Sequence, residues 1–556
     1  MSAAPSQEMV RFSTSDEVDF VIVGSGAAGG VLAKELSANG FTVVVLEQGP
    51  YLRPFQFRHD EVESYFGDGL TGRMADHPQS FRTTPDQEAT PSFFFPALFY
   101  AKAVGGSSLH FAANYWRLRP VDFQERSILG SIPGTTFADW PISYEELEPY
   151  YTKVDWEIGI SGEPGPGDPP RSRGYPMPPM PIKSSGVLLR DGAARAGYTS
   201  KPAPLAILSR PHNGRAPCIH CGLCWGQPCE IGAKSSTLAS MIPVAEATGR
   251  CEIRDRSTVT RVETNAAGRV TRVVYLDADG IEHAQPAKAV VLAANGAETP
   301  RLLMLSESSR HPDGLANSSG YVGKNLMFNY NPATWARFSE PLNEYKSVVA
   351  TRVVMDFYET DPRRGFYGGG GLDARATIGP LFWAALDNPM PGMPAWGPEL
   401  KEQLAAFRFT MLVSGHGTSL PREQNSISLD DDLVDAWGRP GIRVTYEDHP
   451  DDLAFGTFLQ DRSVEIMEAA GAERIWRVPV GPSTIAAHLL GTCRMGDDPD
   501  TSVVDRYHRT HDVPNLFICD GSSMVTSGRG QPTMTIQALA FRAADHMTEF
   551  ARRGEM

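Results

Sequence analysis

The sequence predicts an α/β fold in which a dinucleotide-binding unit with a parallel sheet is joined to a second domain, built on an antiparallel sheet flanked by helices. Two observations predict the first part: an apolar run near the N-terminus ends in a glycine-rich turn, and this turn opens a helical segment. A third observation predicts the second part, because runs such as TRVVMDFY and RFTMLVSG alternate apolar and polar residues at the period of a half-buried strand.

The N-terminal segment VDFVIVGSGAAGGVLAKELSANGFTVVVLEQG predicts a βαβ unit. Its apolar run, residues 18–23, is typical of a buried parallel strand, and a helix and a second strand at 41–46 follow. Gly24, Gly26 and Gly29 have the G-x-G-x-x-G spacing. The first glycine permits the tight turn, the second lets a pyrophosphate approach the backbone, and the third allows the helix to pack closely on the strand.

Glu47 ends the second predicted strand. A carboxylate at this place hydrogen-bonds the ribose hydroxyls of a bound adenosine, and it repels a 2′-phosphate, so NADP is not expected. The glycine motif alone does not separate NAD from FAD.

Four cysteines lie close together in the run CIHCGLCWGQPC: Cys218, Cys221, Cys224 and Cys229. The inner run resembles the ligand loop of a ferredoxin, and three or four thiolates from such a loop could hold a three-iron or a four-iron cluster. Zinc is an alternative, since four thiolates also suit it, although structural zinc usually takes two separated pairs. Disulfides or purely structural cysteines are a second alternative.

Length, composition and charge limit the classes of protein to which this chain can belong. The chain has 556 residues, of which 41% are hydrophobic and 21% charged, so we expect a soluble globular protein of two or more domains. A formal net charge of −15 argues against a nucleic-acid partner. No run of about 18 apolar residues occurs, so no membrane span is expected. The first seventeen residues lack the apolar core of a secretory signal, which predicts a cytoplasmic location unless a signal-bearing partner subunit carries the chain to the periplasm.

Several later segments carry a family resemblance. They are AKAVGGSSLHFAANYWRLRPVDF, DWPISYEELEPYY with its capping-box pair Ser143 and Glu146, AVVLAANGAETPRLLMLS, HLLGTCRMG, and the C-terminal NLFICDGSSMVTSGRGQPTMTIQALAFRAADH. Together they resemble the glucose-methanol-choline (GMC) oxidoreductase family of FAD enzymes over most of the chain. The resemblance implies a Rossmann-like FAD-binding domain of the GMC type and an oxidation of alcohols.

The resemblance also implies the catalytic residues. His488, the first residue of HLLGTCRMG, matches the active-site histidine of the family, which takes the hydroxyl proton while hydride passes to flavin N5. The second active-site residue of the family is a His or Asn just before a proline, and this sequence has Gln531 before Pro532. Glutamine cannot act as a base, but its amide can orient a substrate hydroxyl.

The family pattern also implies the FAD-binding residues. His110 occupies the region in which some relatives attach the flavin covalently, but a packing or hydrogen-bonding role is expected instead, and Thr533 is expected over the pyrimidine end of the flavin ring. The expected FAD-binding set is Gly24, Gly26, Ala27, Ala28, Gly29, Glu47, Gly105, Gly106, Ser107, His110, Asn114, Val259, Ala294, Asp520, Gly521 and Thr533.

The order of the motifs predicts the domains. Residues 15–60, 95–120, 220–330 and 486–556 would form a discontinuous FAD-binding domain, with the cysteine-rich loop 218–229 attached to it. Residues 121–219 would connect the domains and include an extended Pro/Gly-rich loop at 160–182, and residues 331–485 would bind substrate. The aromatic run at 93–95 is expected in the core.

Within the family, a cysteine-rich insert at this place resembles the catalytic subunits of bacterial sugar dehydrogenases. This resemblance implies an acceptor-linked FAD dehydrogenase that oxidises a secondary alcohol of a sugar, glycoside or polyol to a ketone or lactone. Electrons would leave through a 3Fe-4S or 4Fe-4S cluster, and the partners would be a small companion subunit and a cytochrome c acceptor. Two alternatives remain open: an oxidase that reduces oxygen to hydrogen peroxide and has a structural cysteine loop, and a lyase that uses FAD only structurally.

Overall fold

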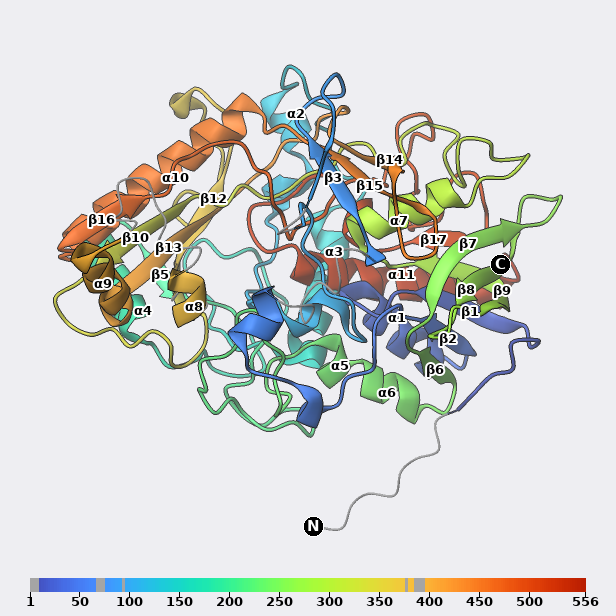
Figure 1. Ribbon diagram of the computed structural model, residues 1–556, viewed down its shortest axis with the longest axis horizontal. Helices are drawn as coiled ribbons and strands as arrows, with labels where there is room; N and C mark the ends of the chain where they lie inside the picture. Colours follow the sequence, from blue (N-terminus) through green and yellow to red (C-terminus); the bar gives the residue numbers. More distant parts are fainter. Residues whose placement is uncertain (1–9, 67–75, 93–95, 376–378, 385–395) are drawn as a thin grey trace, which may run out of the picture.

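The computed structural model describes residues 10–66, 76–92, 96–375, 379–384 and 396–556. The aromatic run at 93–95 lies outside the described residues. Two sheets stand apart in the ribbon view: a mainly parallel sheet near the C-terminus and an antiparallel sheet at the opposite end (Figure 1).

The first sheet has the strand order β6-β2-β1-β9-β8-β7, and β17 also pairs with β9. Strands β1, β2, β6, β9 and β17 pair in parallel, whereas β7 and β8 extend the sheet as antiparallel strands. β1 and β2 are almost wholly buried, as their apolar sequences predict for a parallel sheet covered on both faces. The bounds are β1 Val18–Val23, β2 Val43–Leu46, β6 Cys251–Arg254, β7 Thr258–Thr264, β8 Val270–Leu276, β9 Glu282–Leu292 and β17 Leu516–Ile518.

The predicted βαβ unit is confirmed, with α1 spanning Ala27–Ala38 between β1 and β2. Gly24 has a φ of +94°, and a Cβ there would lie 2.5 Å from the carbonyl oxygen of Ala293. A Cβ on Gly29 would lie 2.0 Å from the carbonyl oxygen of Gly24. Side chains at these two positions would therefore separate the helix from the strands, which is the packing role that the motif predicts.

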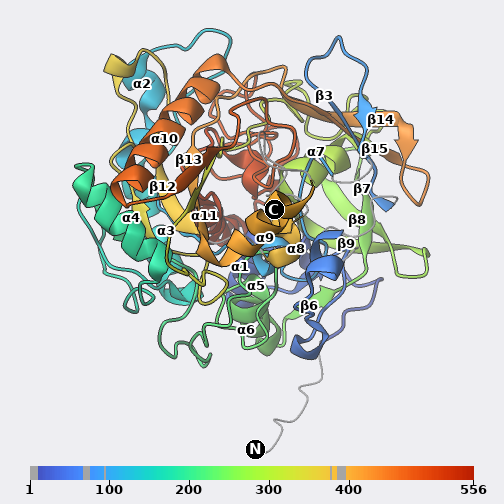
Figure 2. The same ribbon diagram turned by 60° about the vertical axis from the view of Figure 1, so that its left-hand side comes forward.

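The second sheet is antiparallel throughout, with the order β16-β10-β13-β12-β11-β5. The alternating runs of the sequence become β11 and β13, so the expected antiparallel sheet is confirmed. Helices α10 and α4 pack on one face, and Figure 2 brings them to the front. The bounds are β5 Ser200–Pro202, β10 Ala333–Arg337, β11 Ala350–Val354, β12 Gly370–Arg375, β13 Thr410–Gly417, β16 Arg474–Arg477, α4 Ser184–Arg195 and α10 Pro450–Ala469.

Strand alternation gives the second sheet two different faces. Leu372 and Ala374 of β12, with Met411 and Val413 of β13, point into the apolar core shared with α10 and α4. Every second residue of these strands therefore points to the opposite face, away from the helices. That face carries the polar side chains of β12 and β13 described below.

A third sheet, of order β14-β15-β3-β4, uses strands from two distant parts of the chain. Part of the segment 331–485 lies outside the antiparallel sheet. Strands β14 and β15 belong to this segment and pair with each other, and β15 also pairs with β3, which lies far upstream in the sequence. The bounds are β3 Gln79–Arg82, β4 Thr90–Pro91, β14 Ser426–Val434 and β15 Pro440–Thr445.

Among the remaining helices, α11 packs against α1 and α3. Helix α3 begins at the predicted cap, where Ser143 Oγ accepts the Glu146 N–H at 3.2 Å and the Glu146 carboxylate accepts the Ser143 N–H at 3.2 Å. Within the described residues no helix is long and apolar enough to cross a bilayer. The bounds are α2 Glu125–Leu129, α3 Tyr144–Val154, α5 Thr237–Ser240, α6 Ile242–Ala247, α7 Asn295–Leu305, α8 Pro380–Phe382, α9 Pro398–Ala405 and α11 Thr533–Arg553.

Candidate active site

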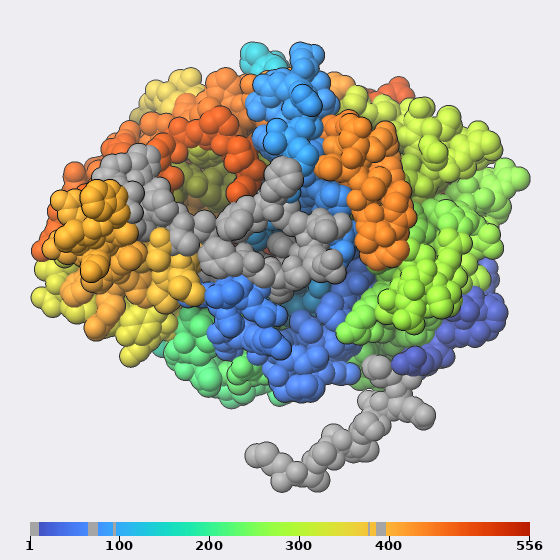
Figure 3. All heavy atoms as spheres, in the orientation of Figure 1, coloured from blue at the N-terminus to red at the C-terminus, as the bar shows by residue number. Residues whose placement is uncertain are grey.

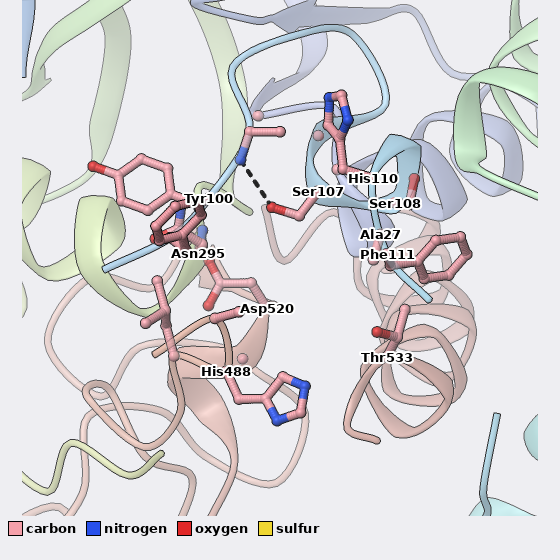
Figure 4. Close-up of a pocket in the computed structure, with 18 of the residues that line it drawn as sticks. Ala27, Tyr100, Ser107, Ser108, His110, Phe111, Asn295, His488, Asp520 and Thr533 are labelled. Atoms are coloured by element: carbon pink, nitrogen blue, oxygen red, sulfur yellow. Dashed lines mark hydrogen bonds between the residues drawn. The ribbon is translucent and has the colours of Figure 1, made fainter. Parts of the chain in front are cut away.

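A cavity of about 810 Å³ has walls from both large sheets, and it is the site to which most sequence predictions lead. Its walls come from the turn after β1, the segment after Phe99, the start of α7, the loop before His488 and the turn that opens α11. Figure 4 shows His488, Asp520 and Asn295 on one side and Ala27, Ser108 and Thr533 on the other. In the space-filling view the surface is hollowed beside the orange-red part of the chain (Figure 3).

One end of the cavity has the features of a nucleotide site. Gly26 and Gly106 lie back to back, and a Cβ on Gly106, whose φ is +54°, would lie 2.8 Å from the Gly26 Cα. Glu47 is buried at the end of β2, where its Oε2 accepts the N–H of Ser25 at 3.0 Å and the hydroxyl of Ser25 at 2.7 Å. Burial raises the pKa of Glu47, although hydrogen bonds from Gly49 and Ser25 oppose this effect. The carboxylate is thereby fixed beside the glycine turn.

Asp520 links the turn after β17 to the start of α7, and both segments line the cavity. Its Oδ2 accepts the Asn295 N–H at 3.0 Å and the Thr299 hydroxyl at 2.6 Å, both from the α7 region, and its Oδ1 accepts the Ser522 N–H at 2.8 Å. Ser107 Oγ accepts the backbone N–H of Ala101 at 3.1 Å, which is the dashed contact in Figure 4. These contacts fix the backbone along the length of the cavity.

Nearly all predicted cofactor residues line this one cavity, and two do not. Gly29 faces the β1 turn and Gly105 faces α5, so both serve packing. The residues that line the cavity are Gly24, Gly26, Ala27, Ala28, Glu47, Gly106, Ser107, His110, Asn114, Val259, Ala294, Asp520, Gly521 and Thr533, together with the predicted catalytic residues His488 and Gln531.

His110 is held by the cysteine-rich loop. Its Nδ1 lies 3.1 Å from the carbonyl oxygen of Gly226, and burial together with the nearby Lys234 cation lowers the pKa of His110 to about 4. In Figure 4 the His110 ring is directed away from His488. These contacts are those of a neutral, hydrogen-bonded histidine.

His488 is a neutral imidazole with a defined tautomer. Its Nδ1 lies 2.9 Å from Asn329 Oδ1, and Asn329 Nδ2 donates to the carbonyl of Gly417 at 3.1 Å and to that of Ser527 at 3.3 Å. Because these carbonyls fix the Asn329 nitrogen, its oxygen must face His488, so His488 carries its proton on Nδ1 and a lone pair on Nε2. Burial, the nearby His416 and the Arg375 cation lower the pKa of His488 to about 4.

Gln531 lies between two histidines. Its Nε2 is 2.9 Å from His416 Nδ1, and it lines the same cavity as His488, where its side chain opposes the lowering of the His488 pKa. His416 was not predicted from the sequence, and neither were its partners Asp373 and Arg375.

These three missed residues come from the polar face of the second sheet. Asp373 Oδ2 lies 2.9 Å from His416 Nε2, Asp373 Oδ1 accepts the Arg375 Nε–H at 2.6 Å, and Arg375 also lies over the Trp225 ring at 5.1 Å. The available signal was the alternation of LDAR in β12 and VSGHG in β13, which places Asp373, Arg375 and His416 opposite the apolar residues. Periodicity shows that these residues share a face, but not that this face lines a cavity.

Family comparison decides what kind of cavity this is. Family models described as GMC oxidoreductase match residues 18–330 and residues 421–540. The chain belongs to the GMC oxidoreductase family. It is 35% identical to 2-methyl-1,2-propanediol dehydrogenase of Mycolicibacterium austroafricanum over 96% of each chain. It is 32% identical to the fructose dehydrogenase large subunit of Gluconobacter japonicus, over 96% of this chain and 98% of that one.

A solved formate oxidase from Aspergillus oryzae has the same fold, with a TM-score of 0.67 at 17% identity over 98% of this chain and 100% of that one. This GMC chain is thus an oxidoreductase that acts on CH–OH groups, and the family implies FAD.

The cavity fits FAD. The Gly26–Gly106 approach leaves bare backbone at the place where a pyrophosphate would lie, and Glu47 stands at the ribose position. Asn114 Nδ2 donates to Asp373 at 2.9 Å, but Asn114 Oδ1 is buried without a protein partner. A buried acceptor with no partner costs about 1–3 kcal/mol unless a ligand satisfies it. Asn114 is therefore suited to accept a hydrogen bond from a bound cofactor.

The four loop cysteines of this GMC chain are free thiols near one another. Cys221 is exposed, Cys224 is buried, and Cys218 and Cys229 are half-buried. Burial, with repulsion from the other three thiols, raises the pKa of Cys224 to about 12. In the described parts of the chain, no three His, Cys, Asp or Glu side chains are arranged to hold a metal ion. The predicted metal site is thus not formed by the side chains as they stand.

The cysteine loop nonetheless contacts the cavity. Trp225 and Gly226, which follow Cys224, are part of the cavity wall. The buried Lys234 ammonium fixes the loop by donating to the carbonyls of Cys224 at 2.7 Å and Gln227 at 2.6 Å. The loop is therefore a fixed part of the GMC active-site wall.

Proposed function

We propose that this protein is an acceptor-linked, FAD-dependent dehydrogenase that oxidises a secondary alcohol of a sugar, glycoside or polyol to a ketone or lactone. The observation that carries the proposal is the neutral His488, whose Nε2 lone pair is set by the Asn329 contact and which lines the cavity that fits FAD. The relatives named for a propanediol and for fructose support an alcohol with several hydroxyl groups.

The protein's part in the reaction begins with proton removal. A bound FAD supplies the hydride acceptor in this family. His488 Nε2 accepts the hydroxyl proton of the substrate, which lets the C–H hydrogen leave as hydride from the same carbon. Because the pKa of His488 is lowered to about 4, the ring is unprotonated at neutral pH and its Nε2 is free to accept a proton. Asn329 Oδ1 remains the acceptor of the Nδ1–H and keeps the ring in place after the proton arrives.

Substrate orientation falls to the neighbouring polar groups. Gln531, Asn331 and Ser414 share the cavity wall with His488, and their amide and hydroxyl groups can hydrogen-bond a polyhydroxylated substrate. Phe382 and Trp225 line the same cavity and offer apolar surface to the carbon skeleton. This mixture suits a sugar or polyol better than a purely apolar alcohol.

A second part of the proposal concerns the exit of electrons. We propose that Cys218, Cys221 and Cys224, with or without Cys229, hold an iron–sulfur cluster that passes electrons to an external acceptor, a cytochrome c in a complex with a small companion subunit. The support is the spacing of the cysteines and the contact of their loop with the cavity wall through Trp225. The thiols would have to reorient to bind metal.

The decisive experiment is anaerobic. Purified FAD-loaded protein is mixed with polyols and sugars, and the flavin absorbance is followed. Bleaching by a secondary alcohol supports the proposal, whereas no bleaching by any sugar, glycoside or polyol contradicts it. Iron and acid-labile sulfide per flavin, measured in protein made in a host that assembles clusters, test the second part. Three or four irons per flavin with matching sulfide would support the cluster. The absence of both iron and sulfide would refute it.

An oxidase is the second candidate. In that case the cysteine loop, which the Lys234 contacts hold in place, would be structural only. Stoichiometric hydrogen peroxide, with no gain in turnover from a dye or a cytochrome, would favour the oxidase over the dehydrogenase.

A further inference from the structure

The 526–530 loop, which lies shortly before α11, contacts the side chain that holds the base. Two of its backbone carbonyls accept hydrogen bonds from Asn329 Nδ2, and Asn329 Oδ1 lies 2.9 Å from His488 Nδ1. We propose that Arg529, in this loop, is a positioning residue: its buried ion pairs hold the loop so that the two carbonyls keep Asn329 turned toward His488. The inference rests on the proposed role of His488 as the base.

Three carbonyl oxygens fix the orientation of the Asn329 amide. Its Nδ2 lies 3.1 Å from the oxygen of Gly417 and 3.3 Å from the oxygens of both Ser527 and Gly528. A carbonyl can only accept hydrogen bonds, so the amide nitrogen faces these three groups and the amide oxygen faces the base. Because two of the three acceptors belong to the 526–530 loop, a shift of this loop would release the amide and leave the N–H of the base without a fixed acceptor.

The 526–530 loop is held in place by side chains. In the part of the chain that the structure describes, its five residues form no hydrogen bond from backbone to backbone, although all of them are buried. Thr526 Oγ1 accepts the Trp140 Nε1–H at 2.9 Å. Ser527 Oγ accepts the backbone N–H of Ser419 at 2.9 Å. The shape of the loop therefore depends on what its side chains bind.

Arg529 ties the loop to two other parts of the chain. Its side chain is fully buried and forms ion pairs with Asp122, at 3.2 Å from Nε to Oδ1, and with Glu125, the first residue of α2. Its Nη1 donates to the carbonyl of Tyr358, and its Nη2 donates to Thr360 Oγ1 at 3.3 Å. Because the last two residues lie in the connection between β11 and β12, one guanidinium attaches the loop to α2 and to the second sheet.

The two carboxylates are themselves held in place. Asp122 Oδ2 accepts the Tyr358 hydroxyl at 2.5 Å and the backbone N–H of Arg119 at 2.6 Å. Glu125 Oε2 accepts the Tyr367 hydroxyl at 2.8 Å. Burial lowers the pKa of the bound guanidinium to about 10, although Asp122 opposes this effect, so the group stays charged at neutral pH. A buried charge is costly to separate from its partners, so these contacts keep the loop against the carboxylates.

A lysine at position 529 would hold the loop less well. The guanidinium of Arg529 has separate N–H groups that reach acceptors on different segments, whereas an ammonium is one compact charge. Arg529→Lys therefore keeps the charge but loses part of the attachment. We expect the loop carbonyls to shift relative to Asn329 in this variant.

The test compares Arg529→Lys with a matched control. The control is Arg254→Lys, which changes an arginine of β6 that binds the Glu252 carboxylate at 2.8 Å and the Tyr275 hydroxyl at 2.8 Å and does not line the cavity. Bound FAD and the melting temperature show whether each variant folds. The measurement is the rate of anaerobic flavin reduction at saturating alcohol, with KM determined separately.

The expected loss falls on the limiting rate. Arg529→Lys should lower this rate about tenfold at unchanged FAD content, because a small displacement near the reacting groups can cost up to about a hundredfold. KM should change less than the rate, since Asn329 acts on the proton transfer. Arg254→Lys should keep the parent rate. A parent-like rate in Arg529→Lys, or a loss that falls on KM alone, would overturn the proposal.

A double-mutant cycle tests the route through Asn329. In an Asn329→Leu background the amide that the loop orients is gone, so Arg529→Lys should slow the reduction by less than about twofold further. Losses that multiply in full would overturn the proposal, because the loop would then act by another route, such as a general loosening of the cavity.

A second variant, Ser527→Ala, decides the matter where Arg529→Lys does not fold. It removes the hydroxyl that accepts the Ser419 N–H and leaves the buried ion pairs intact. We expect a limiting rate about threefold lower in the parent background, as for one lost hydrogen bond, and no further loss in the Asn329→Leu background. An unchanged rate in the first background, or an equal loss in both, overturns the proposal.

Failure of the base role is distinguished by His488→Ala. An unchanged rate in that variant refutes the proposed function itself, whereas a large loss there with a parent-like rate in Arg529→Lys refutes only this inference. Both results come from one set of proteins under the same conditions.

Discussion

The pH dependence of flavin reduction follows directly from the surroundings of His488. The ring is buried, and His416 and Arg375 lie close to it, so its pKa is lowered to about 4. At pH 4 about half of the protein would carry the neutral base, and above about pH 6 the neutral fraction would be about 99%. We therefore expect the rate of flavin reduction to be level from about pH 6 upward and to fall about tenfold per pH unit well below pH 4.

The assay is a stopped-flow pH jump under anaerobic conditions, with the flavin absorbance as readout and protein held near neutral pH until mixing. His488→Ala should lose about 10²–10⁴-fold in rate while keeping bound FAD, because general base catalysis contributes about this much. A midpoint near pH 6.5 would mean that the ring is not desolvated as the structure shows. A near-normal rate in His488→Ala would remove this residue from the base role.

Three further predictions concern the tautomer, the cofactor and the electron exit. Asn329→Leu removes the acceptor of the His488 Nδ1–H, and we expect the flavin to be reduced about ten- to a hundredfold more slowly, since a lost hydrogen bond to a charged ring is worth about 1.5–3 kcal/mol. Gly106→Ala places a Cβ 2.8 Å from the backbone of the glycine turn and should lower the FAD-to-protein ratio on purification, whereas Gly174→Ala, which meets no atom within 4 Å, should not. Cys221→Ser should leave flavin reduction by substrate intact but slow transfer to a one-electron acceptor; normal rates in both half-reactions would contradict a role in electron transfer.

The sequence predicted that the residues of the glycine turn and Glu47 lie together, and the structure brings them to one cavity, because this part of the chain is local. The βαβ unit places Gly24, Gly26 and Glu47 together through contacts within one short stretch of chain, and strand, turn and helix each leave a signal in the sequence. The antiparallel sheet was also predictable, since the two alternating runs become β11 and β13, although β13 is buried along its whole length and not half-buried.

The polar network around His416 was not predictable in the same way. Asp373 and His416 stand on neighbouring strands, and they meet because Gly371 pairs with His416 and Asp373 with Ser414. This register, and the side of the sheet that faces the cavity, depend on how α10 and α4 pack on the opposite face. A pattern of period two identifies the two faces but does not say which one meets the cofactor cavity.

The cysteine loop shows the opposite difficulty, because its motif is clear in the sequence while its chemistry depends on side-chain arrangement. Spacing alone suggested thiolate ligands, yet the thiols carry raised pKa values where they are buried, as at Cys224, which favours the protonated form. Metal binding would have to displace those protons, so the loop binds a cluster only if the metal–thiolate bonds outweigh that cost. Measured iron content is therefore informative in either direction.

The division of the site between two sheets has a consequence for function. The parallel sheet and its glycine turn form the end of the cavity that fits a cofactor, while His488 and the polar residues around it are held by the C-terminal loops and the antiparallel sheet. Asn114 is one side chain that links these parts, since it lines the cavity and donates to Asp373. Substitutions elsewhere on the polar face of β12 and β13 should therefore affect the His488 end of the cavity more than the glycine turn, whereas a substitution of Asp373 would also remove the partner of Asn114.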